Sequence, residues 1–260
     1  MSARAIWKAT LELGNQRIPV KLYAGARDSD IHFRLIHAQD KTPVQQRMID
    51  PQSGETVEAE DIRRGVELEP GTFVVVDERE LDSLAPKPTR TIEITRFVPA
   101  DAVDIGWYAR PYFLGPDGAA SDYGALVEAL RDGNLRGIAR WAMRGRRYFG
   151  ALAAHDRHLA LIALLPAEEV LPAAKLSAPE GKPASAGERA LAEQLVAALD
   201  APFDPSELRD EYRERVLALV RAKAKGRRPP AVREALPKPV SDLSTALKRS
   251  VQAARKRRAA

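Results

Sequence analysis

The sequence contains no cysteine among its 260 residues. A disulfide framework, a thiolate nucleophile and a cysteine-ligated zinc site are therefore excluded. Aromatic residues make up only 6% of the chain. No apolar run approaches the roughly 18 residues that a membrane-spanning helix needs. Because the N-terminus also lacks the regions of a secretory signal peptide, we expect a cytoplasmic protein that does not contact a membrane.

Motifs for catalysis and metal binding are missing as well. The sequence has no phosphate-binding glycine loop, no nucleophile elbow and no HExxH pattern. Its four histidines form two pairs, His32 with His37 and His155 with His158, and neither has a third ligand at a suitable spacing. We therefore expect no catalytic residue, no metal and no cofactor. A binding protein is favoured, and an enzyme assembled from scattered residues, such as a nuclease, is the alternative.

Positive charge is concentrated at the C-terminal end. From Arg221 onward there are 13 basic and two acidic residues, a net charge of +11, whereas the whole chain carries only +5, so the first 220 residues carry −6. A terminal segment of this kind is typical of nucleic-acid binding, because neutralised phosphates release counterions. The alternative is a solvated tail that only aids solubility.

Apolar and polar residues alternate through the first 165 residues, which indicates many short strands. Ala5–Leu13 and Ile18–Leu22 flank Gly14-Asn15 and predict a β-hairpin. A helix with Ser121 as its N-cap is predicted over Asp122–Arg131. Further strands are predicted at Ile31–Ile36, Thr72–Asp77, Thr91–Val98, Arg110–Leu114, Gly137–Arg144, Arg147–Ala153 and His158–Leu165. The pattern predicts a mainly β protein with some α structure (α+β), built on an antiparallel β-barrel.

One long polar stretch does not fit a compact barrel. Residues 41–71 are rich in turn residues and too long for a simple connection. Partial alternation at Val44, Gln46 and Met48 favours a hairpin that projects from the core as an arm. We expect residues 1–172 to form the barrel together with this arm.

The rest of the chain predicts helices separated by linkers. Residues 173–187 are rich in Pro, Ala, Gly and Ser and indicate a linker. Residues 188–226 are predicted to be helical: Ser185, just before them, forms a capping box with Glu188 for one helix, and a second helix is predicted to start at Asp204-Pro205. Residues 227–260 form a basic extension with one amphipathic helix, which carries Leu243, Leu247 and Val251 on one face.

Arginines are the candidate contacts for a nucleic acid. Arg140 and Arg144 lie on one predicted strand face, opposite Ala139, Trp141 and Met143, and Arg146 and Arg147 follow the Gly145 turn. Guanidinium groups bind phosphate oxygens without selecting a sequence. The alternative is that these arginines pair with the surplus acids of the core.

The ordered segments resemble bacterial Ku. The stretches that carry the resemblance are ARAIWKATLELGNQRIPVKLYAG, IHFRLIHAQD, EAEDIRRGVELEPGTFVVVDERELDSLAPKPTRTIEITRFV, RPYFLGPDG, YGALVEAL, GIARWAMRGRRYFGAL, EQLVAAL and YRERVLALVRAKAKG. Their order and spacing match the family from Ala3 to about Gly226. Some members carry a cysteine pair where this chain has Met48 to Gly54, so a zinc-dependent feature is not expected here.

The resemblance implies a homodimer whose barrels and arms form a ring around ends of double-stranded DNA in non-homologous end joining. It also implies recruitment of an ATP-dependent DNA ligase through the C-terminal region, where Leu243, Leu247 and Val251 would be the contact, and a place at the bacterial nucleoid. The residues it would assign to DNA are Arg34, Lys41, Gln45, Arg47, Arg63, Arg64, Arg140, Arg144, Arg146, Arg147, Arg255, Lys256, Arg257 and Arg258. The alternatives are a general DNA-coating protein that binds through its basic tail and an adaptor without affinity for DNA.

Overall fold

The computed structural model describes residues 4–172, 176–177 and 183–226. It divides into two units, Met1–Lys175 and Leu176–Ala260, which are described separately. The first unit contains β1 (Trp7–Leu13), β2 (Gln16–Ala24), β3 (Arg64–Glu69), β4 (Thr72–Val76), α1 (Glu78–Leu84), β5 (Thr91–Pro99), η1 (Ala100–Ala102), η2 (Ile105–Trp107), β6 (Tyr108–Pro116), α2 (Ala120–Asp132), β7 (Leu135–Met143), β8 (Arg146–His155) and β9 (His158–Leu164). The second contains α3 (Ala186–Leu199), η4 (Pro205–Glu207) and α4 (Glu211–Ala224). None of the described helices has the length and apolar character needed to cross a membrane.

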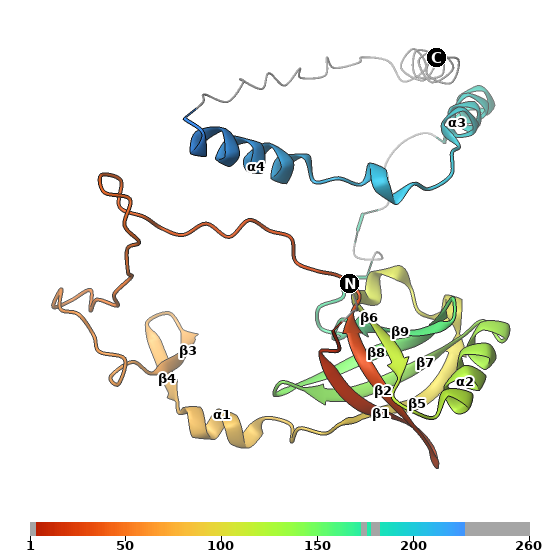
Figure 1. Cartoon of the computed structure of the whole chain (residues 1–260), viewed down its shortest axis with the longest axis horizontal. Coiled ribbons are helices and arrows are strands. Elements are labelled where there is room, and N and C mark those ends of the chain that lie inside the picture. The colour runs from red at the N-terminus through yellow and green to blue at the C-terminus, as the bar shows by residue number, and fades with distance from the viewer. Residues whose placement is uncertain (1–3, 173–175, 178–182, 227–260) are drawn as a thin grey trace. The chain divides into compact units, whose positions relative to one another are not determined.

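Seven strands close into a barrel in the order β1-β2-β6-β9-β8-β7-β5 (Figure 1). Six neighbouring pairs are antiparallel, and β1 pairs with β5 in parallel. The predicted α+β class with a β-barrel core is confirmed, but the expectation of a wholly antiparallel barrel was wrong for this closing pair. A tight turn dictates antiparallel pairing, whereas β5 follows a long connection that leaves its direction open.

The β1–β2 hairpin shows how alternation builds the core. Its strands are joined by Gly14 and Asn15, with Leu13 opposite Gln16, as the sequence predicts. Leu11, Val20 and Leu22 point inward and are fully buried, whereas the residues between them are partly or fully exposed. This period of two leaves the outer face of the barrel free for polar and charged residues.

Helix α2 completes the core through one apolar stripe. Tyr123, Val127 and Leu130 recur at helical spacing and are buried among the barrel side chains. The Tyr123 hydroxyl donates a hydrogen bond to the Leu114 carbonyl (2.5 Å) and accepts one from the Leu159 N–H (2.8 Å). This hydroxyl therefore joins α2 to strands β6 and β9.

The predicted start of α2 was wrong by two positions. The helix begins at Ala120 after Ala119, which adopts a left-handed conformation and provides no side-chain cap, so Ser121 lies inside the first turn. Gly118 and Ala119 both have positive φ, and this tight turn after β6 sets the helix start in place of a capping hydroxyl.

Most predicted strands of the barrel are confirmed, but the strand at Ile31–Ile36 was wrong. Only one isolated bridge, between Ile36 and Pro43, occurs there. A β-strand needs a neighbouring strand for its backbone groups, and these residues lie outside the barrel, mostly exposed.

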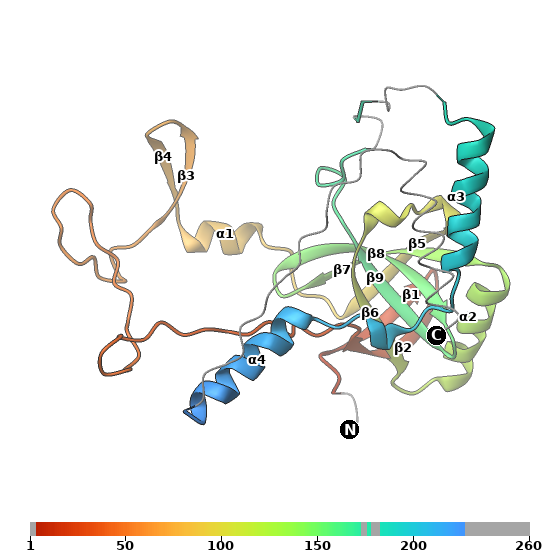
Figure 2. The ribbon, with the colours of Figure 1, turned by 90° about the horizontal axis from the view of Figure 1, so that it is seen from above.

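The connection between β2 and β5, residues 25–90, contains the predicted arm. It leaves the barrel sheet after β2 and rejoins it at β5 (Figures 1 and 2). A hairpin is present in it, but as β3–β4 and not at Val44–Met48, where the described chain forms only two isolated bridges nearby, Ile36 with Pro43 and Ile49 with Thr56. Helix α1 follows, with a capping box between Asp77 and Glu80. Nearly all residues of this segment are exposed.

In the second unit, the predicted capping box of Ser185 and Glu188 starts α3. The second helix was predicted to begin at Asp204-Pro205, which was wrong: Asp204 accepts a hydrogen bond from the Ser206 N–H and closes only the short turn η4. Helix α4 begins later, where the Asp210 carboxylate accepts from the Arg213 N–H. Two successive aspartates can each cap a turn, and the sequence pattern did not distinguish the longer helix from the shorter one.

A carboxylate at the end of β6 makes stability depend on pH. Asp117 forms ion pairs with Lys21 (2.6 Å) and Lys8 (3.1 Å), and their hydrogen bonds hold the pKa of this carboxyl below its usual value. The charged form is favoured in the folded state, so this contribution is present above the unfolded pKa and is lost as pH falls through the folded pKa. We expect Asp117→Asn to lower the thermal midpoint at neutral pH.

The difference between Asp117→Asn and the wild type should shrink as pH falls below the usual carboxyl pKa, and it should vanish below the lowered folded-state pKa of Asp117, where both side chains are neutral. Thermal melts at fixed protein concentration across pH test this, with Glu128→Gln on the exposed face of α2 as the matched control. A constant difference at all pH values would contradict it.

Candidate nucleic-acid interface

The β7–β8 hairpin carries four of the predicted arginines at its turn and flanking strands. Met143 pairs with Arg146, so the turn consists of Arg144 and Gly145, both with positive φ (54° and 73°). This geometry matches the twist of the strands but costs a non-glycine residue roughly 1–2 kcal/mol. Arg144 therefore lies exposed at the tip of the hairpin, whereas the sequence had predicted it on a strand face with Arg140.

Cross-strand register separates the remaining arginines. Ala139, Trp141 and Met143 lie on the face opposite Arg140, as predicted, and are buried there, which leaves Arg140 on the outer face of β7. Arg147 lies opposite Ala142 and shares that outer face, whereas Arg146 lies opposite Met143 on the other face. The structure thus brings Arg140 and Arg147 together and does not place all four arginines on one surface.

Arg140 already has an acidic partner. Its Nε and Nη2 donate to the two carboxylate oxygens of Glu93 on β5, at 2.7 and 2.8 Å. This pairing holds the pKa of the Glu93 carboxyl below its usual value, because the hydrogen bonds favour the ionised form. The alternative of pairing with core acids therefore applies to Arg140, although the Nη1 group takes no part in these two bonds.

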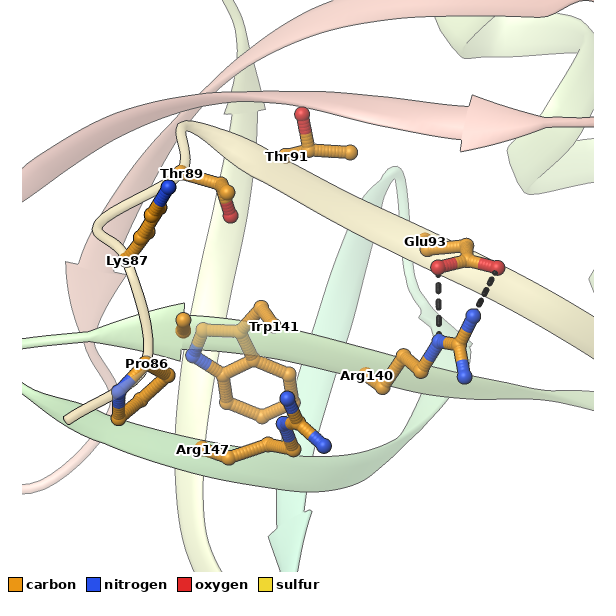
Figure 3. Close-up of a pocket in the computed structure, with 9 residues that line it drawn as sticks. Pro86, Lys87, Thr89, Thr91, Glu93, Arg140, Trp141 and Arg147 are labelled. Atoms are coloured by element: carbon orange, nitrogen blue, oxygen red, sulfur yellow. Dashed lines mark hydrogen bonds and ion pairs between the residues drawn. The ribbon is translucent and has the colours of Figure 1, made fainter. Parts of the chain in front are cut away.

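A cavity of about 550 Å³ lies beside this ion pair, at the edge formed by the N-terminal end of β5 and by strands β7 and β8 (Figure 3). The residues that line it are Pro86, Lys87, Thr89, Thr91, Glu93, Arg140, Trp141, Ala142 and Arg147. Its charged groups are three cations and one carboxylate. Within the described chain, the Lys87 and Arg147 side chains have no hydrogen-bond or ion-pair partner.

The predicted arm residues lie along the exposed connection. Arg63 donates to the backbone carbonyls of Glu60 and Ile62, and Arg64 lies 3.7 Å from the Glu78 carboxylate. Arg63 and Arg64 line a second cavity of about 710 Å³ together with Arg79 of α1. The side chains of Arg34, Lys41, Gln45, Arg47, Arg144 and Arg146 are without a polar partner among the described residues.

The β3–β4 hairpin exposes an apolar face. Val66 lies opposite Val74 and Arg64 opposite Val76, so three valines share one side of a two-stranded sheet. Val66 and Val74 are 56% and 46% exposed, and Leu68 beside the bulge is 71% exposed. An isolated hairpin is only marginally stable in water. This surface, defined as the arm valine face (Val66, Val74 and Val76), therefore needs a cover that the described chain does not supply.

Sequence reasoning missed Lys87 and Arg79 as possible contacts. Lys87 lies in Pro86-Lys87-Pro88, where the prolines force an extended backbone and a charged side chain has no helix or strand face to join. Arg79 lies in the first turn of α1, two residues after the N-cap Asp77. Its charge alone did not indicate that it would line a cavity with Arg63 and Arg64.

Several predicted residues lie outside the described chain. They are Arg255, Lys256, Arg257 and Arg258 of the basic tail and Leu243, Leu247 and Val251 of the expected ligase contact. Among the residues that are described, no three His, Cys, Asp or Glu side chains cluster in a way that would hold a metal ion.

A closed barrel with a long exposed insertion and an arginine-bearing hairpin defines a β-barrel protein equipped to bind a polyanion. The family model described as Ku70/Ku80 beta-barrel domain matches residues 12–195. The chain belongs to the Ku family.

Similar bacterial proteins extend this match over nearly the whole chain. The non-homologous end joining protein Ku of Solibacter usitatus (strain Ellin6076) is 35% identical over 257 residues, which cover 98% of this chain and 96% of that protein. The protein of the same name from Anaeromyxobacter sp. (strain K) is 38% identical over 259 residues, 98% of this chain and 87% of that protein. The predicted membership of the bacterial Ku family is therefore confirmed.

Proposed function

We propose that this protein binds the ends of double-stranded DNA as a ring-shaped homodimer in non-homologous end joining. The observation that carries the proposal is the exposed connection of residues 25–90, inserted into a Ku-type barrel and bearing the uncovered arm valine face. In this proposal two such connections, one from each subunit, close around the duplex.

The arm valine face supports a partner of the same kind. Exposed apolar side chains on a marginal hairpin gain stability when a second apolar surface removes them from water. A second copy brings an identical hairpin, which is self-complementary across a two-fold axis. In this proposal the arm valine faces pack at the dimer interface, and the apolar side chains of α3 and α4, such as Val196 and Tyr212, pack on the core or on the partner subunit.

Arginines account for binding without sequence preference. Guanidinium groups contact phosphate oxygens, which are the same at every base pair. The candidates that reach the DNA from the barrel are Arg144, Arg146 and Arg147, with Arg140 contributing less because it is paired with Glu93. From the arm, the candidates are Arg34, Lys41, Gln45, Arg47, Arg63 and Arg64.

The proposed role is that of a binding factor and not of an enzyme. After the ends are held, an ATP-dependent DNA ligase would join them, recruited through Leu243, Leu247 and Val251, while Arg255 to Arg258 contact DNA. The protein would work at the nucleoid of the bacterial cytoplasm.

Threading gives a direct test. A closed ring needs a free end to load, so linear duplex should bind, whereas covalently closed circles and duplexes with hairpin caps at both ends should not. A mobility-shift series with the three DNAs at equal length measures this. Equal affinity for circular and linear DNA would contradict the proposal, and metal-dependent cleavage of the duplex would indicate a nuclease instead.

The rival model, a DNA-coating protein that binds through its basic tail, predicts a different result for a shortened chain. Ending the chain after Gly226 removes Arg227 to Ala260 and most of the surplus positive charge. If the shortened protein still binds linear duplex in an end-dependent and salt-sensitive manner, the coating model fails. Loss of all binding with the tail would favour it.

A further inference from the structure

A buried hydrogen-bond donor without an acceptor among the described residues lies at the cavity beside the Arg140–Glu93 ion pair. Nε1 of Trp141 is the one buried side-chain polar atom without a hydrogen-bond partner in the described chain. Buried polar groups nearly always have partners, because an unpaired one costs about 1–3 kcal/mol. Indole N–H is a donor only, so the missing partner must be an acceptor.

The indole ring is held in place, so the donor has a defined direction. Trp141 is 3% exposed and stacks on Tyr148, with ring centroids 5.3 Å apart and planes inclined by 13°. Gly150 lies against the ring, and a Cβ added there would come within 2.7 Å of it. Figure 3 shows the indole nitrogen on the side of the ring that faces Pro86, at the wall of the cavity.

The charge around this donor selects an anion. The bidentate pair of Arg140 and Glu93 is neutral as a unit, which leaves Lys87 and Arg147 as two cations without partners in the described chain. The Thr89 and Thr91 side chains add hydroxyl groups to the lining. Two cations, hydroxyl donors and an indole N–H match a group with several acceptor oxygens, as a phosphate has.

The wall of the cavity can adjust to a ligand. The described backbone of residues 86–89 makes no hydrogen bond to the barrel, and the ladder resumes only where the Arg90 carbonyl accepts from the Thr10 N–H. Nε1 is shielded from water, so an acceptor reaches it only if this segment moves. Binding should therefore change the surroundings of Trp141 and of residues 86–89 together.

We infer that this cavity is a phosphate site, in which Lys87, Arg147 and the Trp141 indole N–H hold a phosphate group of the bound DNA. The inference rests on the proposed DNA-end binding and specifies one place where the barrel grips the strand. The phosphate comes either from the strand backbone or from the 5′ terminus of the break.

The test reads Trp141 directly in the full-length protein. Three tryptophans produce three indole N–H signals in a ¹H–¹⁵N spectrum, and Trp141→Phe assigns the one that belongs to the cavity. The probes are inorganic phosphate, linear duplex with 5′-phosphate ends and the same duplex with 5′-hydroxyl ends. We expect the Trp141 signal to shift with DNA, because the N–H gains an acceptor.

The two phosphate sources are distinguished by the same titrations. Equal shifts with both duplexes assign a backbone phosphate, and a shift confined to the 5′-phosphorylated duplex assigns the terminal one. A shift with inorganic phosphate but with neither duplex would overturn the inference, as would a Trp141 signal that no probe moves. Because binding of linear and circular DNA is measured separately by mobility shift, a silent Trp141 in a protein that binds linear DNA leaves the proposed function intact.

Affinity provides a second, independent readout. Lys87→Gln and Arg147→Gln should each weaken binding to linear duplex about fivefold to tenfold and lower the slope of log K against log salt by about 1. Arg157→Gln, at the β8–β9 turn at the opposite end of β8, is the matched control and should leave both unchanged. Equal effects of all three variants would show that only the overall positive charge of the protein matters. That result would overturn the inference of a specific phosphate site.

Discussion

A protein in which Val66 and Val74 are both replaced by aspartate should be monomeric and should no longer retain linear DNA. The two side chains lie opposite each other on the arm valine face and are the most exposed of its three valines. In the proposed dimer, each aspartate would be buried against an apolar surface, and the nearby cation Arg64 already lies 3.7 Å from the Glu78 carboxylate. Burial of unpaired charge costs several kilocalories per mole, so the dimer dissociation constant should rise by about 100-fold or more.

Sedimentation and mobility shifts measure this effect on assembly and on DNA. Affinity for linear duplex should fall with dimerisation, because one subunit cannot close a ring. The double variant Phe73→Asp with Val75→Asp is the matched control, since it places the same two charges at exposed positions on the opposite face of the same hairpin. A double variant that stays dimeric would place the dimer contact elsewhere, and a monomer that still binds linear ends with full affinity would contradict the ring.

Removing the hydroxyl of Tyr123 should produce the largest loss of stability for a single-atom change. Tyr123→Phe leaves the Leu159 N–H and the Leu114 carbonyl without their partner, inside a core where Leu114 and Leu159 are at most 1% exposed. Each unsatisfied group costs roughly 1–3 kcal/mol, so the free energy of unfolding should fall by about 2–6 kcal/mol. Burial also raises the pKa of this hydroxyl, which keeps it protonated and able to donate.

Denaturant unfolding followed by circular dichroism, at one protein concentration, measures this loss. Tyr148→Phe is the control, because its hydroxyl has no hydrogen-bond partner in the described chain and its ring continues to stack on Trp141. Loss of stability in both variants alike would show that the Tyr123 hydroxyl does not link α2 to the barrel.

Local features were predictable where neighbouring residues decide them. The β1–β2 hairpin follows from Gly14-Asn15 between alternating runs, and the start of α3 from the capping box of Ser185 and Glu188. The predictions failed where local signals compete or need a distant partner. Ile31–Ile36 alternates like a strand but has no strand beside it, and Asp204 caps only a short turn because Asp210 caps the longer helix.

The candidate interface was predictable only as a set of arginines. Charge and spacing indicated Arg140, Arg144, Arg146 and Arg147, but not that Glu93 pairs with the first. Glu93 lies 47 residues earlier in the chain, and such a pair forms only because β5 lies beside β7. Lys87 was missed for the same reason, because it lines the same cavity as Arg147 only when β5 lies beside β7.

By itself, the sequence determines the alternation that makes a β-barrel, the absence of any cysteine chemistry, the concentration of positive charge after Arg221 and the family to which the chain belongs. The tertiary structure alone decides the parallel closure of β1 on β5, the burial of an unpartnered indole N–H beside Lys87 and Arg147, and the uncovered valines of the arm. The physical reason is range: alternation and capping act within a few residues, whereas strand order, ion pairing and cavities depend on contacts between segments that are distant in sequence.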